Sequence, residues 1–456
     1  MEFATMAAAR FGYGASPYMP LPNSAAEYLA ALRGADMMAS KFPILQAGEG
    51  SKMLAQFSPL QRAEREQKDG AAQEFKALKQ GINQVIVVGL RARLARAVED
   101  PTGIRERLYQ FWTDHFTVVG RRLREHPMTL EHQEYAVRPY LTGRFADMFK
   151  AAVTHPAMVI YLDQNRSVGP NSAQAKKKPQ KGFGLNENLA REVMELHSLG
   201  VDGHYTQDDV RQLAELFTGM FHSESGGFQF LPGLAEPGAE DVLGVSYGGG
   251  RASMADIDAV LDALAKHPDT AAHLAHKLAV HFASDTPPDD LVEALRSTYL
   301  AQDGALMPLY EILLTHPSVA ATLGQKIRQP LDYIASGLRA LGVRGDELMA
   351  MPYKDFRALI RAPMQLMGQK WIQPIGPDGW AEDALAWISP QELAARIEWS
   401  MRLPQKFDTQ ITDAPAFAKA ALGDRASAAL LYAVPRAETR AEGIGLVLAS
   451  AEFNRR

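Results

Sequence analysis

One stretch of the sequence concentrates side chains that can bind a metal ion or transfer protons. Residues 186–207 read NENLAREVMELHSLGVDGHYTQ, in which polar and charged groups alternate with regularly spaced leucines. At about 100° per helical residue, Asn188, Glu192 and Glu195 form an i, i+4, i+7 stripe at the edge of the leucine face. A carboxylate in that position has to be paired, protonated or bound to a metal, because burying a bare charge is costly.

The preceding segment, YLDQNRS, adds an aspartate and an asparagine at the end of another predicted helix. Oxygen-rich ligand sets suit Mg, Ca or Mn, and an added imidazole would allow Zn or Fe. We therefore predict three groups of site residues: catalytic Asp163, Glu192, Glu195 and His197; substrate-binding Asn165, Asn186, Asn188, Arg191, Tyr205 and Trp380; and, for a divalent metal cofactor, Asp163, Glu192, Glu195 and His115.

The alternative for the glutamates is an internal ion-pair network. Arg191 is adjacent to the stripe, and Arg138 or Arg328 could also neutralise a carboxylate. The motifs HExxH, GxxxxGK[ST] and GxSxG are absent, so the common metalloprotease, nucleotide and serine-hydrolase signatures do not apply. Cysteine is absent as well, which excludes thiolate ligands and cysteine nucleophiles.

The elements that would position these residues are mostly helices. Apolar residues recur at three- and four-residue spacing in many segments, among them 104–116, 144–162, 208–221, 254–266, 330–341 and 390–402. Only residues 226–250 alternate like strands, and they predict a small β-hairpin insertion in which Phe228 and Phe230 face Val242 and Val245. The expected fold is mainly α and multi-helical, in one domain over residues 1–456.

Several signatures recur in the same order, which predicts two related helical lobes at 85–222 and 254–402. GRFADMFKAAVTHPAMVIYLDQ resembles GALMPLYEILLTHPSVAATLGQ, and NENLAREVMELHSLGV resembles RQPLDYIASGLRALGV. Chance leucine spacing is the alternative explanation. Features in both copies, such as the Thr-His-Pro turns, are expected to be scaffold, whereas the polar stripe occurs in the first copy only.

Composition narrows the class of protein further. The 456 residues carry a net charge of −5, which gives no reason to expect nucleic acid as a partner. No apolar run approaches the roughly 18 residues that a membrane span requires. The start of the chain does not look like a signal peptide, so we expect a cytoplasmic protein, or a periplasmic one if the chain is a processed form.

The segment NENLAREVMELHSLGVDGHYTQDDV closely resembles the signature of the bacterial DUF1800 family, as do YLDQNRSVGPNS, FWTDHFTV, KLAVHFASDTPP and GPDGWAEDALAWISP. The resemblance spans nearly the whole chain. The family is uncharacterised, so it implies no settled activity. It does imply a partner, because genes of the family often lie beside those of sulfatase- or phosphatase-like, frequently exported proteins.

Two functional hypotheses follow. The first is a hydrolase-type enzyme with a carboxylate-rich site on helix 186–199, with or without a metal. The second is a non-catalytic helical partner or assembly factor for an envelope or exported enzyme. In the second hypothesis the polar stripe is an ion-pair network and the lysine-rich loop 167–184 is a docking element.

Overall fold

The computed structural model describes residues 2–223, 227–407 and 413–456, and helices dominate it. The helices of the first half are α1 (Phe3–Phe11), α2 (Ala25–Arg33), α3 (Met37–Lys41), α4 (Glu49–Arg65), α5 (Ala71–Glu99), α6 (Ile104–His115), α7 (His126–His132), α8 (Phe145–Thr154), α9 (Pro156–Tyr161), α10 (Ala173–Lys177), α11 (Asn188–Glu195) and α12 (Gln207–Leu216).

Those of the second half are α13 (Met254–Ala265), α14 (Pro268–Phe282), α15 (Asp289–Ala301), α16 (Leu306–Thr315), α17 (Pro317–Ala321), α18 (Pro330–Ala340), α19 (Gly345–Ala350), α20 (Tyr353–Phe356), α21 (Ala362–Leu366), α22 (Pro390–Arg402), α23 (Ala414–Leu422), α24 (Ala428–Ala433), α25 (Arg440–Ala449) and α26 (Ala451–Asn454). Short 3₁₀ or π turns include η1 (Leu123–Glu125), η2 (Gln133–Val137), η3 (Arg138–Tyr140), η4 (Gln164–Arg166) and η6 (Arg357–Arg361). The mainly α fold class is confirmed. No helix in the described ranges is both long and apolar enough to cross a bilayer.

The predicted hairpin is two hairpins. β1 (Met220–Ser223) pairs with β2 (Gly227–Phe230), and β3 (Ala239–Val242) pairs with β4 (Val245–Gly248), both antiparallel. The predicted contact of Phe228 and Phe230 with Val242 and Val245 is therefore wrong. The backbone at Leu243 and Gly244 has φ of 52° and 75°, which closes a tight turn and pairs Val242 with Val245. Gly226, the first residue of the predicted hairpin, lies outside the described residues.

The histidine-proline turns are scaffold, as expected. The predicted helix 144–162 breaks at His155 into α8 and α9, because Pro156 begins a new helix at its first position. The Nδ1 atom of His155 accepts a hydrogen bond from Ala157 N at 3.1 Å, and His316 caps α17 in the same way through Ser318 N at 3.3 Å. Each imidazole thus supplies an N-terminal cap, which is a structural role.

The two helices that precede the Thr-His-Pro turns, α8 and α16, also contact one another at their N-terminal ends. Phe145 N donates to the carbonyl of Gly304 at 2.8 Å, and Leu306 N donates to the carbonyl of Gly143 at 3.0 Å. Two copies related by a twofold axis make reciprocal contacts of this kind. The internal repeat stays a prediction, and this reciprocity supports it.

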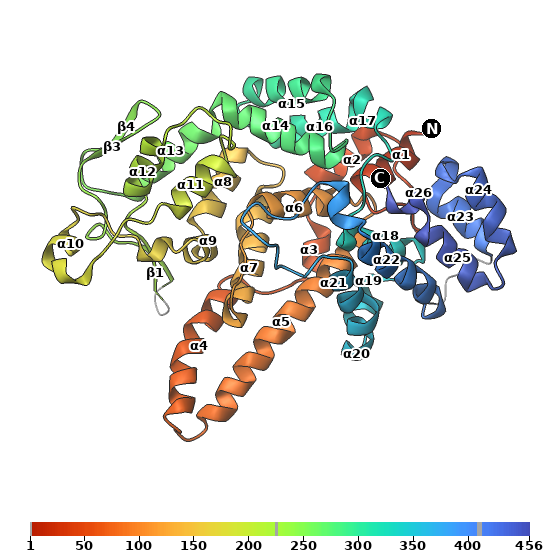
Figure 1. Cartoon of the computed structure of the whole chain (residues 1–456), viewed down its shortest axis with the longest axis horizontal. Coiled ribbons are helices and arrows are strands. Elements are labelled where there is room, and N and C mark those ends of the chain that lie inside the picture. Colours follow the sequence, from red (N-terminus) through yellow and green to blue (C-terminus); the bar gives the residue numbers. More distant parts are fainter. Residues whose placement is uncertain (1, 224–226, 408–412) are drawn as a thin grey trace.

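Two large hydrophobic cores and one smaller cluster, which includes Phe42, Leu130 and Ile372, organise the helices of the described residues. The first contains α1, α2, α6, α8, α9 and α11–α16, and the second contains the end of α5 with α18–α25. Because α13–α16 lie in the first core, the division between cores does not follow the predicted lobes 85–222 and 254–402. The hairpin of α4 and α5 projects away from the body, at the bottom of Figure 1.

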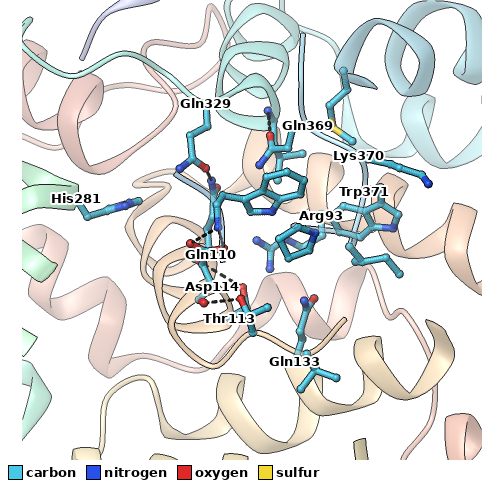
Figure 2. A pocket seen from close by; sticks show the side chains of 17 residues that line it. Arg93, Gln110, Thr113, Asp114, Gln133, His281, Gln329, Gln369, Lys370 and Trp371 are labelled. Atoms are coloured by element: carbon cyan, nitrogen blue, oxygen red, sulfur yellow. Dashed lines mark hydrogen bonds between the residues drawn. The ribbon is translucent and has the colours of Figure 1, made fainter. Parts of the chain in front are cut away.

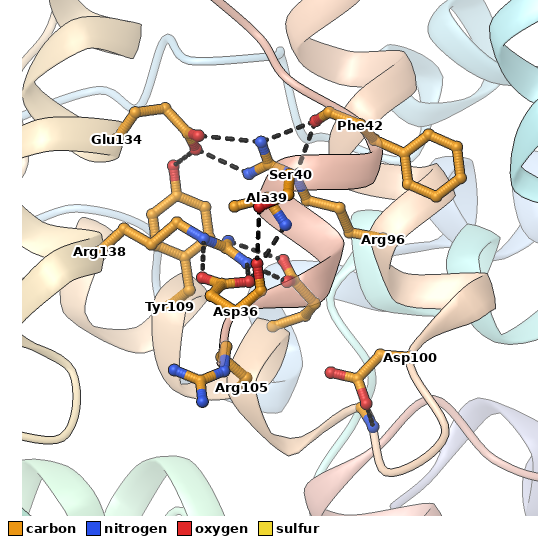
Figure 3. Close-up of polar contacts among 12 residues, drawn as sticks. Asp36, Ala39, Ser40, Phe42, Arg96, Asp100, Arg105, Tyr109, Glu134 and Arg138 are labelled. Carbon is orange, nitrogen blue, oxygen red and sulfur yellow. Dashed lines mark hydrogen bonds and ion pairs between the residues drawn. The ribbon is translucent and has the colours of Figure 1, made fainter. Parts of the chain in front are cut away.

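Buried ion pairs join the centre of the first core to the N-terminal helices (Figure 3). Arg138 in η3 binds both Glu106 of α6 and Asp36, the residue that caps α3. Arg96 of α5 forms a two-pronged pair with Glu134 at 2.8 and 2.9 Å and donates to the Phe42 carbonyl. A buried charge without its partner is strongly destabilising, so these contacts fix α3, α5 and α6 relative to one another.

We predict that Glu106→Gln lowers the free energy of unfolding by about 3 kcal/mol, because it leaves the buried Arg138 with Asp36 as its only carboxylate. The control is Glu398→Gln, since Glu398 pairs with Arg402 on the surface with side chains 64% and 52% exposed. That pair should contribute less than about 0.5 kcal/mol. Urea unfolding midpoints measure both changes, and equal effects would contradict the structural role of the network.

Candidate functional site

Helix α11, which carries the predicted site, is held in place by Asn186, two residues before its first residue. The Oδ1 atom of Asn186 accepts from Asn188 N at 3.0 Å, and its Nδ2 atom donates to the Leu162 carbonyl at 3.0 Å. Leu189 and Val193 are buried. Asn186 is therefore a structural residue that joins α11 to the end of α9, whereas the predicted substrate ligand Asn188 is exposed.

Arg191 neutralises one predicted catalytic glutamate. Its guanidinium pairs with Glu195 at 3.2 Å and with Glu187 at 3.2 Å, and it donates to Gln207 at 2.9 Å. Tyr205 lies beside Glu195, and burial together with that carboxylate raises the pKa of the phenol. The ion-pair alternative thus describes the environment of Glu195.

Glu192 differs from its neighbour. It is half-buried, and its carboxylate makes no hydrogen bond or ion pair within the described residues. Burial raises the pKa of Glu192, and the charges of Glu195 and Asp378 raise it further, against a smaller opposing effect of Arg191. A carboxylate that is partly desolvated and unpaired costs stability, and such groups are concentrated at functional sites.

Asp163 and Asn165 line a separate, basic pocket of about 220 Å³. Asp163 has a left-handed backbone with φ of 56° and lies 3.6 Å from Arg121 and 3.4 Å from Arg166. Those separations exceed the 2.7–2.9 Å usual for charge-assisted hydrogen bonds, so both guanidinium groups, which are largely exposed, are only loosely held. The other lining residues include Arg122, Arg124, Glu125, Tyr161 and His222.

Tyr161 connects this pocket with Glu192. Burial raises the pKa of the Tyr161 phenol to about 12, and both Glu192 and Asp378 are near enough to add to that shift. The phenol is therefore neutral near pH 7 and available as a hydrogen-bond donor. The charges of Glu192 and Asp378 therefore act on Tyr161, which lines the basic pocket.

The two predicted histidines lie in the core. His115 Nε2 contacts the backbone carbonyl of His197 at 3.3 Å, and the two ring centroids are 5.8 Å apart. Burial lowers the pKa of both imidazoles, that of His197 to about 3, so both are neutral. The structure does not bring them to the carboxylates, because His197 follows the end of α11 and turns inward.

The predicted metal ligands do not form an assembled site in the part of the chain that the structure describes. No three His, Asp or Glu side chains there are grouped so that they could hold an ion. The predicted ligands are instead separated: Glu195 pairs with Arg191, Asp163 lies among arginines, and His115 is in the core.

Trp380 belongs to a second pocket, which includes Asp114 of α6 (Figure 2). The backbone N–H of Trp380 donates to both carboxylate oxygens of Asp114, at 2.9 and 3.2 Å. Gly379 has φ of +84°, and a Cβ atom there would lie 2.7 Å from the Asp114 carboxylate. Only glycine allows this approach, so the sequence GPDGW wraps the loop around the Asp114 side chain.

Burial raises the pKa of Asp114, with further increases from Glu382 and Asp378. The Trp380 N–H and the ammonium group of Lys277 act in the opposite direction. Burial also lowers the pKa of Lys277, which makes no hydrogen bond or ion pair within the described residues. The exposed loop residue Asp378 contributes to the raised pKa of both Asp114 and Glu192 through its negative charge.

A buried chain of charges holds this loop in place. Glu382 pairs with His281 of α14 at 2.5 Å and with Lys326 at 2.9 Å. Burial opposes ionisation, but His281 and Lys326 together lower the pKa of Glu382 to about 2. His281 in turn contacts Arg107 at 3.2 Å, and Arg107 pairs with Asp332.

Asp114, Lys277 and Asp378 were not among the residues predicted from sequence. Asp114 lies in FWTDHF and Asp378 in GPDGW, two segments that were noted for their resemblance and not for their acids. An aspartate within a Gly-Pro-Gly loop, followed by tryptophan, was the available signal. Nothing in the sequence indicated that this loop would reach α6.

Comparison with protein families gives one match. The family model "Protein of unknown function (DUF1800)" matches residues 6–455. No curated protein and no solved structure matched the chain. The family match covers essentially the whole chain, and the protein therefore belongs to the DUF1800 family.

Proposed function

We propose that this protein is a hydrolase-type enzyme in which Glu192 is the general base. One observation carries the proposal: Glu192 is half-buried and has no cationic partner, whereas Glu187 and Glu195 on the same helix are both paired with Arg191. A carboxylate whose pKa is raised by burial and by neighbouring charges is a stronger base than an ordinary one.

In this proposal Glu192 takes a proton from the attacking water. Asp378 and Glu195 increase the basicity of Glu192 through their negative charges. Tyr161, which is neutral, donates a hydrogen bond to the substrate beside the carboxylates. Arg191 does not act on the substrate; it holds Glu195 and thereby the stripe in place.

The basic pocket next to Tyr161 is the proposed place for the rest of the substrate. Asp163 and Asn165 line it together with Arg121 and Arg166. Asp163 orients both guanidinium groups, so its predicted catalytic role becomes a positioning role. Asn165 makes no hydrogen bond within the described residues and can therefore bind substrate directly.

The second candidate function is a non-catalytic partner or assembly factor, with a sulfatase- or phosphatase-like protein as the expected partner. The projecting hairpin of α4 and α5 favours it, because an arm that leaves the body offers a surface for another protein (Figure 1). The lysines at the end of α10 offer a basic docking element. A non-catalytic protein would show no hydrolysis in the wild type, and Glu192→Gln would therefore have no effect on activity.

We predict that Glu192→Gln raises the melting temperature, by an amount equivalent to roughly 0.5–1 kcal/mol, because it removes an unpaired carboxylate. An acid whose pKa is raised in the folded state binds more protons when folded, so it lowers stability as the pH rises from about 4.5 through the raised pKa. Glu192→Gln should abolish this part of the pH dependence. Glu195→Gln, which breaks the Arg191 pair, should lower the melting temperature slightly.

We further predict that the purified protein hydrolyses at least one class in a panel of chromogenic carboxylic, phosphate and sulfate esters, glycosides and peptides. Glu192→Gln should reduce kcat/KM for that class by about 10²- to 10⁴-fold. In the wild type, kcat/KM should fall as the pH drops through the raised pKa of Glu192. Glu187→Gln is the matched control on the same helix and should retain activity; equal losses in both variants would refute the general-base role.

A further inference from the structure

Arg93 of α5 is a buried guanidinium without an anion. Its residue is 6% exposed, its Nη1 atom has no hydrogen-bond partner, and it forms no ion pair within the described residues. Its one strong contact is the face of the Tyr109 ring, with the guanidinium carbon 4.0 Å from the ring centroid. A cation–π contact offsets part of the desolvation of an arginine but leaves its hydrogen-bond donors unused.

Several other arginines at similar depth are compensated, and even Arg456, whose guanidinium nitrogens make no hydrogen bond within the described residues, has a carboxylate oxygen of Asp332 at 4.0 Å. Arg96 and Arg138 pair with carboxylates. Arg339 donates to the backbone carbonyls of Gly14, Ala97, Val98, Asp100 and Pro101. Because the fold supplies partners for these buried guanidinium groups, the isolation of Arg93 points to a ligand that supplies the missing anion.

Arg93 lines the pocket that also contains Asp114 and Trp380 (Figure 2). Four glutamine amides line the same pocket: Gln110, Gln133, Gln329 and Gln369. Of these, the side-chain amide of Gln133 makes no hydrogen bond within the described residues, so it is a second unused donor. Asp114 does not compensate Arg93, because its carboxylate is held by the Trp380 N–H and forms no ion pair.

The size and walls of the pocket limit what can enter. About 50 Å³ is free, which is room for a group of a few atoms and not for a whole large ligand. Trp371 and Trp380 provide flat apolar walls, and the exposed Lys370 lies at the rim. A planar carboxylate matches the fork of a guanidinium and is smaller than a phosphate, which would also bring more charge into the site.

We propose that this pocket binds a small organic acid, or the C-terminus of a peptide, through a carboxylate group that pairs with Arg93. Gln133 donates the second hydrogen bond, and the body of the ligand lies against the tryptophan walls. The inference goes beyond the proposed hydrolase function and does not depend on Glu192. It concerns binding, which is measured without turnover.

The test measures melting temperature and calorimetric affinity with benzoate, its neutral analogue benzamide, the dipeptide Gly-Phe, Gly-Phe amide and inorganic phosphate. We expect benzoate or Gly-Phe to raise the melting temperature of the wild type, whereas benzamide and Gly-Phe amide do not. Arg93→Met should weaken the affinity by about 10- to 100-fold, the effect of losing a charged hydrogen bond. A response to Gly-Phe alone identifies the peptide C-terminus as the source of the carboxylate.

Arg357→Met is the matched control, since Arg357 is exposed and makes no side-chain hydrogen bond or ion pair within the described residues. It should bind the acids like the wild type. If Arg93→Met does not fold, Arg93→Lys keeps the charge but loses the fork, and it should bind at least several-fold more weakly. The proposal is overturned if no carboxylate stabilises the wild type, if the Arg93 variants bind as well as the wild type, or if phosphate alone shows Arg93-dependent binding.

Discussion

The need to compensate charge in the interior controls how this protein is assembled. Arg107 in the middle of α6 is fully buried, and it is neutralised by Asp332 of α18 while contacting His281 of α14. His281 and Lys326 in turn hold Glu382. None of these side chains could be buried alone, so the helices of the first core, the start of the second core and the loop at 371–382 have to come together at one point.

The position of that loop determines the chemistry of the surrounding surface. With Glu382 anchored, Gly379 and Trp380 close over Asp114, and the charge of Asp378 in the same loop raises the pKa of Asp114 and of Glu192. The same molecule therefore contains fully paired charges, which hold the structure, beside side chains with no ion pair in the described part of the chain, at Glu192, Lys277 and Arg93. Ionisable groups that are buried without partners cost stability, which is why the two proposals above rest on Glu192 and Arg93.

The sequence was sufficient for the helical class and for the local polar pattern, and insufficient for contacts between distant segments. Apolar spacing predicted α6, α13 and α22 closely, because each buries a continuous stripe. The same spacing predicted one helix across His155, where the structure has a helix break, and it extended the predicted helix 208–221 into strand β1. Apolar periodicity shows neither a helix cap nor the point where backbone hydrogen bonding changes from a helix to a strand. The sequence predicted a helix where α11 lies, but only the structure distinguishes Glu195, which pairs with Arg191, from Glu192, which has no ion pair within the described residues. Arg93 could not be recognised at all, because an uncompensated arginine is defined by what surrounds it.

Apart from His281, the pocket around Arg93 takes its walls from two parts of the chain that are far apart, residues 93–133 and 329–380. If the polypeptide were divided between them, each fragment would carry an incomplete half, with the guanidinium on one piece and the tryptophan walls on the other. Recovery of carboxylate binding on mixing the fragments would then serve as a reporter of their reassociation. It also means that genetic drift in either segment alone would disable the pocket, so the two segments are expected to change together over evolutionary time.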